Sequence, residues 1–90
     1  MSKKYRKKTV EIEAMQFTYN SLDEIKEFVD EDYYVGIESI PERPLELIIE
    51  TDEGTHHAKE GDWIIKGVND EFYPCGPDVF NKTYELVGDN

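Results

Sequence analysis

The chain has 90 residues, of which 38% are hydrophobic, 34% charged and 12% aromatic. This length suits one domain, and the composition is that of a small globule rather than of a disordered segment. No apolar run approaches the roughly 18 to 20 residues of a membrane span, and no apolar stretch follows the charged N-terminus, so we expect neither a span nor a secretory signal. The single cysteine excludes an internal disulfide and a multi-cysteine metal site, and it favours a reducing, intracellular environment.

The charge is unevenly distributed along the chain. Ten basic and 21 acidic residues give −11, but five of the basic residues lie within positions 3–8, so residues 9–90 carry −16. A body this acidic repels phosphate, and we therefore expect no general nucleic-acid binding. Solubility is the simplest explanation of the charge, and a basic partner protein, in the extreme case one that normally binds DNA, is the functional alternative. Residues 1–8 are expected to be a basic, frayed terminus.

The first predicted element is a strand over residues 10–17, where apolar residues alternate with glutamates. The apolar side switches after Ala14. A β-bulge within residues 14–16, or burial of both faces at this end, would accommodate the switch.

A short helix is predicted to begin at Ser21. Ser21 and Glu24 have the spacing of a capping box, in which each side chain accepts a hydrogen bond from a backbone N–H of the first turn. The acidic run 30–32 is expected to end the helix because carboxylates oppose its dipole there. One apolar stripe should face a sheet: Leu22, Ile25, Phe28 and Val29.

The rest of the chain alternates short apolar runs with turn residues. Strands are predicted over residues 45–50, 55–59, 63–65, 71–74 and 83–87, and the aromatic and β-branched run 33–37 is a further candidate strand. The connecting segments are a proline-containing loop at 40–44 and tight turns at 51–54, 60–61 and 67–70. Pro77 predicts a short helical turn over 77–80, and Tyr84 and Leu86 are expected to face inward from the last strand.

These elements predict an α+β fold in which one short N-terminal helix packs on a strongly curled, mainly antiparallel meander, in the order β-α-β-β-β-β-β. A single domain covers residues 1–90. One helix cannot cover both faces of such a sheet, and an edge strand remains free, so we expect two copies to pair. The mutual repulsion of two chains of −11 opposes this homodimer.

Several segments together resemble a widespread family of small phage and prophage proteins without an assigned role. They are GDWIIKGV at 61–68, EFYPC at 71–75, PDVF at 77–80, TYE at 83–85, and the opening 5–17. The resemblance covers nearly the whole chain except about 32–44. In that family a glycine usually precedes the Glu-Phe pair, whereas Asp70 stands here, and we expect the hairpin to form with modest strain because Asp tolerates turn conformations. The resemblance implies a phage-related protein in the host cytoplasm and supplies no catalytic residue.

The residue types most often used in catalysis are sparse. His56 and His57 are adjacent, so in a strand they point to opposite faces and cannot readily share one metal ion. Cys75 precedes the proline of the predicted helical turn, a position that can activate a thiol, but the sequence shows no base or oxyanion site beside it. We therefore expect no enzyme, no metal and no cofactor.

The aromatic residues suggest where contacts form. They concentrate in the last third of the chain, where core packing is the simpler interpretation and a ligand pocket or self-association face is the alternative. Tyr33 and Tyr34 are adjacent, so one of them should face outward beside an acidic loop. The candidate interaction residues are Tyr33, Tyr34, Trp63, Tyr73 and Cys75.

The sequence most favours a non-catalytic, acidic accessory protein of a phage or prophage that binds a host or phage protein. The first alternative is a module that binds or sequesters a nucleotide-like molecule at an oligomer interface. A phosphate-rich ligand would require Arg43, Lys59, Lys66 or Lys82 to converge on one site. A Cys75-dependent enzyme using His56 or His57, and an accessory role in the virion, are the remaining alternatives.

Overall fold

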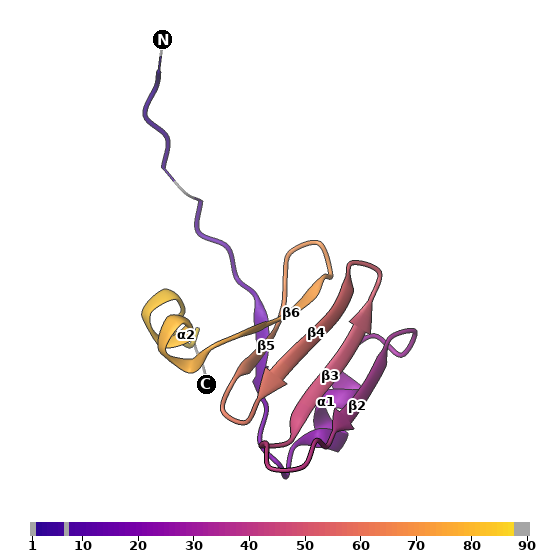
Figure 1. Cartoon of the computed structure of the whole chain (residues 1–90). Coiled ribbons are helices and arrows are strands. Elements are labelled where there is room, and N and C mark those ends of the chain that lie inside the picture. Colours follow the sequence, from indigo (N-terminus) through magenta and orange to yellow (C-terminus); the bar gives the residue numbers. More distant parts are fainter. Residues whose placement is uncertain (1, 7, 88–90) are drawn as a thin grey trace.

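The computed structural model describes residues 2–6 and 8–87. It contains two three-stranded antiparallel sheets and two helices (Figure 1). One sheet has the strand order β1-β5-β6, formed by Glu13–Gln16, Trp63–Lys66 and Phe72–Cys75. The other has the order β2-β3-β4, formed by Tyr34–Glu38, Glu46–Thr51 and Gly54–Lys59. The helices are α1, Leu22–Phe28, and α2, Pro77–Thr83.

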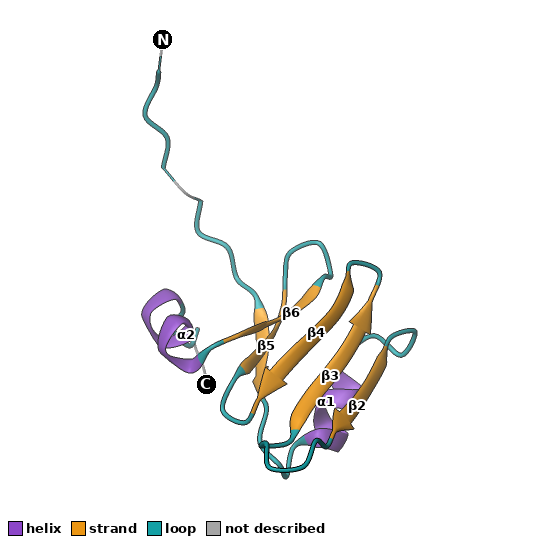
Figure 2. Cartoon of the chain, in the orientation of Figure 1, coloured by secondary structure: helices purple, strands orange, loops and turns teal. Residues whose placement is uncertain are grey.

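The α+β class is confirmed, but the predicted architecture is wrong in three respects. The strands form two sheets, no strongly curled meander is seen, and there are two helices (Figure 2). The predicted strand over 83–87 is not formed: Thr83 ends α2, and residues 84–87 have no regular secondary structure. Leu86 is 95% exposed instead of facing inward, whereas Tyr84 is partly buried. Pro77 at the first position of α2 starts a helix that runs longer than predicted.

Hydrogen bonds just after β1 explain why the strands form two sheets instead of the predicted single meander. The N–H of Phe17 donates to the carbonyl of Asp62 at 2.8 Å, and the N–H of Gly61 donates to the carbonyl of Phe17 at 2.8 Å. The backbone just after β1 therefore pairs with the turn between β4 and β5. As a result, β1 takes the place beside β5 that β4 would occupy in a meander.

Strand β1 is shorter than predicted and contains no bulge. Its four residues pair in unbroken register with β5. Val10 lies outside the strand and is 51% exposed, whereas the adjacent Ala14 and Met15 of β1 are both partly buried, so burial on both faces accounts for the apparent switch. Phe17, just after β1, is fully buried.

Helix α1 packs as its apolar stripe predicts, but its capping box is absent. Ile25 and Val29 are buried, and Leu22 and Phe28 pack against the core. The hydroxyl of Ser21 instead accepts a hydrogen bond from its upstream neighbour, the Thr18 N–H, at 2.8 Å. It thus stabilises the turn that leads into the helix rather than the first helical turn.

One hydrophobic core joins the two sheets and α1. Its members are Phe17, Ile25, Val29, Leu47, Ile49, Ala58, Ile64 and Phe72. Burial of each large aliphatic or aromatic side chain contributes about 1.5 to 3 kcal/mol, so this shared core holds the two sheets together. Helix α2 lies outside this core, at the far end of β6 (Figure 1). No helix in the described part of the chain is long and apolar enough to cross a membrane.

Candidate functional site

The candidate site lies at the end of the β2-β3-β4 sheet, where Tyr33 contacts Asp52 and is within electrostatic range of Asp30 and Glu53. Asp30 follows α1, whereas Asp52 and Glu53 form the turn between β3 and β4. The Tyr33 hydroxyl donates to Oδ2 of Asp52 at 3.4 Å. We call Asp30, Asp52 and Glu53, gathered around this hydroxyl, the acidic corner.

Local hydrogen bonds set the backbone of both acidic segments. The carboxylate of Asp30 accepts from the N–H of Asp32 at 2.9 Å, and its carbonyl accepts from the N–H of Tyr33 at 2.9 Å. In the β3–β4 turn, the hydroxyl of Thr51 accepts from the N–H of Glu53 at 3.1 Å. These turns bring acidic segments that are more than 20 residues apart in sequence to the same end of the sheet.

The acidic corner concentrates unneutralised charge. The pKa of Tyr33 is raised above its usual value, first because its phenol is partly removed from water and then because of the carboxylates of Asp52, Asp30 and Glu53. Among the residues that the structure describes, none of these three carboxylates has a basic nitrogen within 4.0 Å. A cationic group placed here would relieve the repulsion among them.

The two tyrosines diverge, as the sequence predicts. The ring of Tyr33 packs edge-on against Phe72, with ring centroids 6.2 Å apart and an interplanar angle of 85°. Tyr34 points to the outer face of the sheet and is 58% exposed. The residue that follows Tyr33 thus presents an accessible aromatic ring on the outer face of the sheet, and aromatic rings of this kind are common in protein-binding surfaces.

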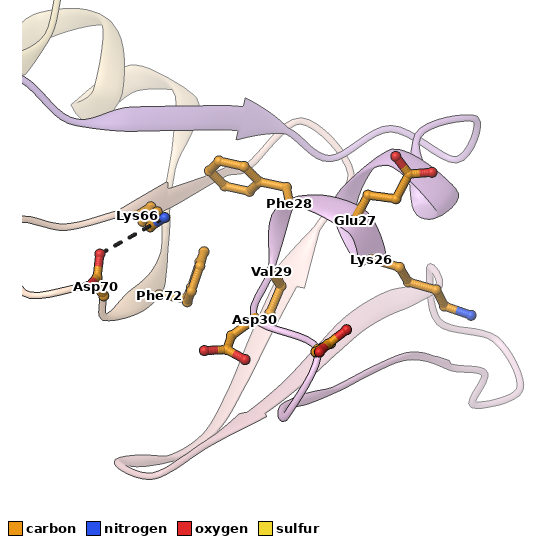
Figure 3. A pocket seen from close by; sticks show the side chains of 9 residues that line it. Lys26, Glu27, Phe28, Val29, Asp30, Lys66, Asp70 and Phe72 are labelled. Carbon is orange, nitrogen blue, oxygen red and sulfur yellow. Dashed lines mark ion pairs between the residues drawn. The ribbon is translucent and has the colours of Figure 1, made fainter.

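An open depression of about 660 Å³ adjoins the acidic corner (Figure 3). Phe28 and Phe72 supply its apolar part, and their rings pack edge to face with centroids 5.7 Å apart. Asp30 belongs both to the lining of this depression and to the acidic corner. The other lining residues are Lys26, Glu27, Val29, Glu31, Lys66 and Asp70.

The depression does not meet the condition for a phosphate-rich ligand. Its two lysines face four acidic residues, and Lys66 already pairs with Asp70, with Nζ and Oδ1 3.9 Å apart. Arg43, Lys59 and Lys82 do not line it. The basic residues on which the nucleotide alternative depends therefore do not converge here.

Trp63, Tyr73 and Cys75 lie on the other sheet, away from the two tyrosines of the candidate site. The ring of Trp63 stacks on Phe80 of α2, with centroids 4.1 Å apart and an interplanar angle of 5°. Burial and then a hydrogen bond with Tyr84 raise the pKa of Tyr73 to about 12. These rings dock α2, so intramolecular packing accounts for the aromatic residues of the last third.

The structure places Cys75 and the histidines on different sheets. The thiol of Cys75 donates to the carbonyl of Gly76 at 3.6 Å, and both histidines lie on β4. His57 is exposed and its ring lies 3.2 Å from a carboxylate oxygen of Glu46, whereas Nε2 of His56 is buried without a partner in the described part of the chain.

Sequence inspection missed two groupings. The pair Asp52 and Glu53 is one of many adjacent acidic pairs, and only the fold brings it to Asp30 and Tyr33. A second grouping brings together potential metal ligands from three strands: Glu38, Glu46 and His57. The sequence alone does not reveal this grouping, because it depends on the register in which β2, β3 and β4 pair.

No family model, curated protein or solved structure matches this chain. The resemblance to small phage proteins stays a prediction from the segments quoted above. The geometry of the acidic corner is therefore the main indication of function.

Proposed function

We propose that the chain is a non-catalytic interaction module that binds a basic surface on another protein through the acidic corner and Tyr34. The observation that carries the proposal is the gathering of three carboxylates without a basic partner around the Tyr33 hydroxyl. An arginine or lysine of a partner would donate charge-assisted hydrogen bonds to these carboxylates. The ring of Tyr34 would supply apolar contact area and a face for cation–π contact.

The position of β2 adds a second mode of contact. Strand β2 is an edge of its sheet, because it pairs with β3 alone. Its other edge offers backbone groups to an extended segment of a partner. A basic segment lying along β2 would reach the acidic corner at the Tyr34 end of the strand.

On the basis of the resemblance, we extend the proposal to a phage or prophage protein that acts in the cytoplasm of the host cell and has a host or phage protein as its partner. The charge of −16 over residues 9–90 supports a partner that normally binds nucleic acid. In that case duplex DNA and this chain compete for the same basic surface.

The test compares capture of proteins from host lysate by the wild-type chain and by D52N/E53Q. We expect a captured protein that is released as salt rises, and whose capture D52N/E53Q reduces about tenfold or more, because charge-assisted contacts are lost. The matched control is D23N/E24Q, which removes two exposed carboxylates from α1 and should capture as well as wild type. Equal capture by D52N/E53Q and wild type, or capture that resists high salt, would contradict the proposal.

The depression favours the small-molecule alternative only for a ligand that is not nucleotide-like. Its volume is within the range of ligand sites, but its four acidic residues favour a cationic or neutral ring over a nucleotide. A ligand panel of cationic aromatic compounds, read by thermal melting, tests this alternative. Melts that shift with such a compound in wild type but not in K66A/F72L would favour it over protein binding.

A further inference from the structure

A second cluster of ligating side chains lies at the opposite end of the β2-β3-β4 sheet from the acidic corner. Glu38, the last residue of β2, pairs in register with Glu46, the first residue of β3. His57 of β4 pairs with Ile48, two residues after Glu46, so His57 is the diagonal neighbour of Glu46 on the same face. This is the outer face, because the alternating residues Leu47 and Ile49 belong to the core.

The three ligating atoms are already close. Nδ1 of His57 lies 3.2 Å from Oε1 of Glu46 and 4.0 Å from Oε1 of Glu38, and the ligand atoms of the three side chains all lie within 4.8 Å of one another. Two ligands of a tetrahedral zinc ion, at bond lengths of about 2.0 to 2.1 Å, are about 3.3 to 3.4 Å apart. The Glu46–His57 separation matches that spacing, and a side-chain movement of less than 1 Å brings the Glu38 oxygen to the same distance from His57.

The three side chains have a constrained backbone and solvent-accessible ligating atoms. All three are anchored in paired strands, which restricts where their ligating atoms can go. Their side chains remain 50%, 44% and 32% exposed for His57, Glu38 and Glu46, so an ion and its remaining water ligands have access.

We propose that Glu38, Glu46 and His57 bind one divalent transition-metal ion of the zinc type, with water completing the coordination. One imidazole nitrogen and two carboxylate oxygens are a donor set that zinc accepts. The nitrogen ligand disfavours magnesium and calcium, which prefer oxygen. The ion would tie together the ends of β2 and β3 that flank the loop over 39–45.

A neighbouring lysine makes a distinctive prediction about affinity. Lys59 pairs in register with Glu46 on the same face, so its ammonium group repels a bound cation. At a separation of about 6 to 8 Å in water, and with the screening of physiological ionic strength, removing one positive charge should tighten binding of a divalent ion about two- to threefold. Tighter binding in K59Q would be a gain of function that loss of folding cannot imitate.

The experiment is a calorimetric titration of the full chain with zinc chloride, with circular dichroism as a check on folding. We expect one zinc ion per chain, displaced little by excess magnesium. H57Q and E46Q should each weaken binding about tenfold or more, because each removes one of three protein ligands. The matched control is E50Q, which removes an exposed carboxylate from the same strand at its other end and should bind within about twofold of wild type.

Three results would overturn the proposal: no binding at millimolar zinc, H57Q and E46Q binding zinc as wild type does, or E50Q weakening zinc binding as much as they do. The last two would mean that zinc associates with the acidic surface in general. NMR provides a second readout, since zinc should shift the ring resonances of His57 and leave those of His56, which faces the interior, nearly unchanged. The proposal does not depend on the acidic corner, so partner capture and zinc binding fail or succeed separately.

Discussion

The ring of Tyr34 lies over Gly36, two residues farther along the same strand. A Cβ atom built on Gly36 would be 2.6 Å from Cζ and 2.9 Å from Cε2 of the tyrosine, well inside contact distance. Gly36 is buried although it faces the outer side of the sheet, because this ring covers it. The aromatic ring thus fills the space that a side chain at position 36 would take, which offsets the weakening effect of glycine within a strand.

Gly36→Ala should therefore destabilise the protein by about 0.5 to 1 kcal/mol, a modest cost because the new methyl group displaces only the exposed end of the tyrosine ring. In a Tyr34→Ala background the same change should be neutral or stabilising by a few tenths of a kcal/mol, because the obstacle is gone and alanine loses less backbone entropy. Urea denaturation of the four proteins gives the coupling free energy, which we expect to be about 0.5 to 1 kcal/mol. Additive effects would show that the ring moves aside freely.

Phe80 is the main anchor of α2, through its stack on Trp63. Phe80→Ala should destabilise the protein by about 1 to 2 kcal/mol, a moderate loss because the ring is only partly buried. It should also speed amide exchange over residues 77–83 and alter the fluorescence of Trp63, the single tryptophan. Val79→Ala, at a 59% exposed neighbour, should change the unfolding free energy by less than about 0.5 kcal/mol. Unchanged exchange in the Phe80 variant would mean that other contacts hold α2.

Local patterns predict much of this fold. The α1 stripe and the hairpin over β3 and β4 appear as expected, because side-chain periodicity and the turn at Gly54, with φ of 126°, are encoded within a few residues. The arrangement of the sheets is not local. It depends on the pairing of Phe17 with the turn at Gly61 and Asp62, over 40 residues away, and no short-range pattern reports that contact.

The same distinction applies to the candidate sites. Adjacency alone predicts that one of Tyr33 and Tyr34 faces outward, and the exposure of Tyr34 confirms it. The acidic corner needs the β3–β4 turn to meet the segment after α1, a tertiary relationship. After Pro77 a local pattern predicts the wrong element. The β-branched and aromatic residues at 83–87 are typical of a strand, but the helix that begins at Pro77 continues to Thr83.

Asp70 occupies a left-handed backbone conformation in the turn between β5 and β6, with φ of 60°. Asp70→Gly should raise stability by about 0.5 to 1 kcal/mol, because glycine adopts this conformation without a steric cost. The exposed ion pair with Lys66, at 3.9 Å, contributes little and its loss should not reverse the sign. Thermal melts should show a rise of a few degrees for Asp70→Gly and little change for Asp70→Asn, which keeps a side chain suited to this conformation. A decrease for both variants would assign the main role to the carboxylate instead.

Tyr73 makes stability sensitive to alkaline pH. Burial, and then the hydrogen bond with Tyr84, raise its pKa from 10.0 to about 12 in the folded protein. In the unfolded chain the phenol loses its proton near pH 10, whereas the folded protein keeps it, so the contribution to stability is complete below pH 10 and falls as the pH rises toward 12.

The variant that isolates this effect is Tyr73→Phe, which cannot ionise. Urea denaturation between about pH 8 and 12 should show that the stability difference between wild type and Tyr73→Phe is constant up to pH 10 and then shifts in favour of the variant. Tyr5→Phe is the control, since Tyr5 is 90% exposed and its loss should leave the pH profile unchanged. Parallel profiles for wild type and Tyr73→Phe would mean that the phenol ionises equally in the folded and unfolded states.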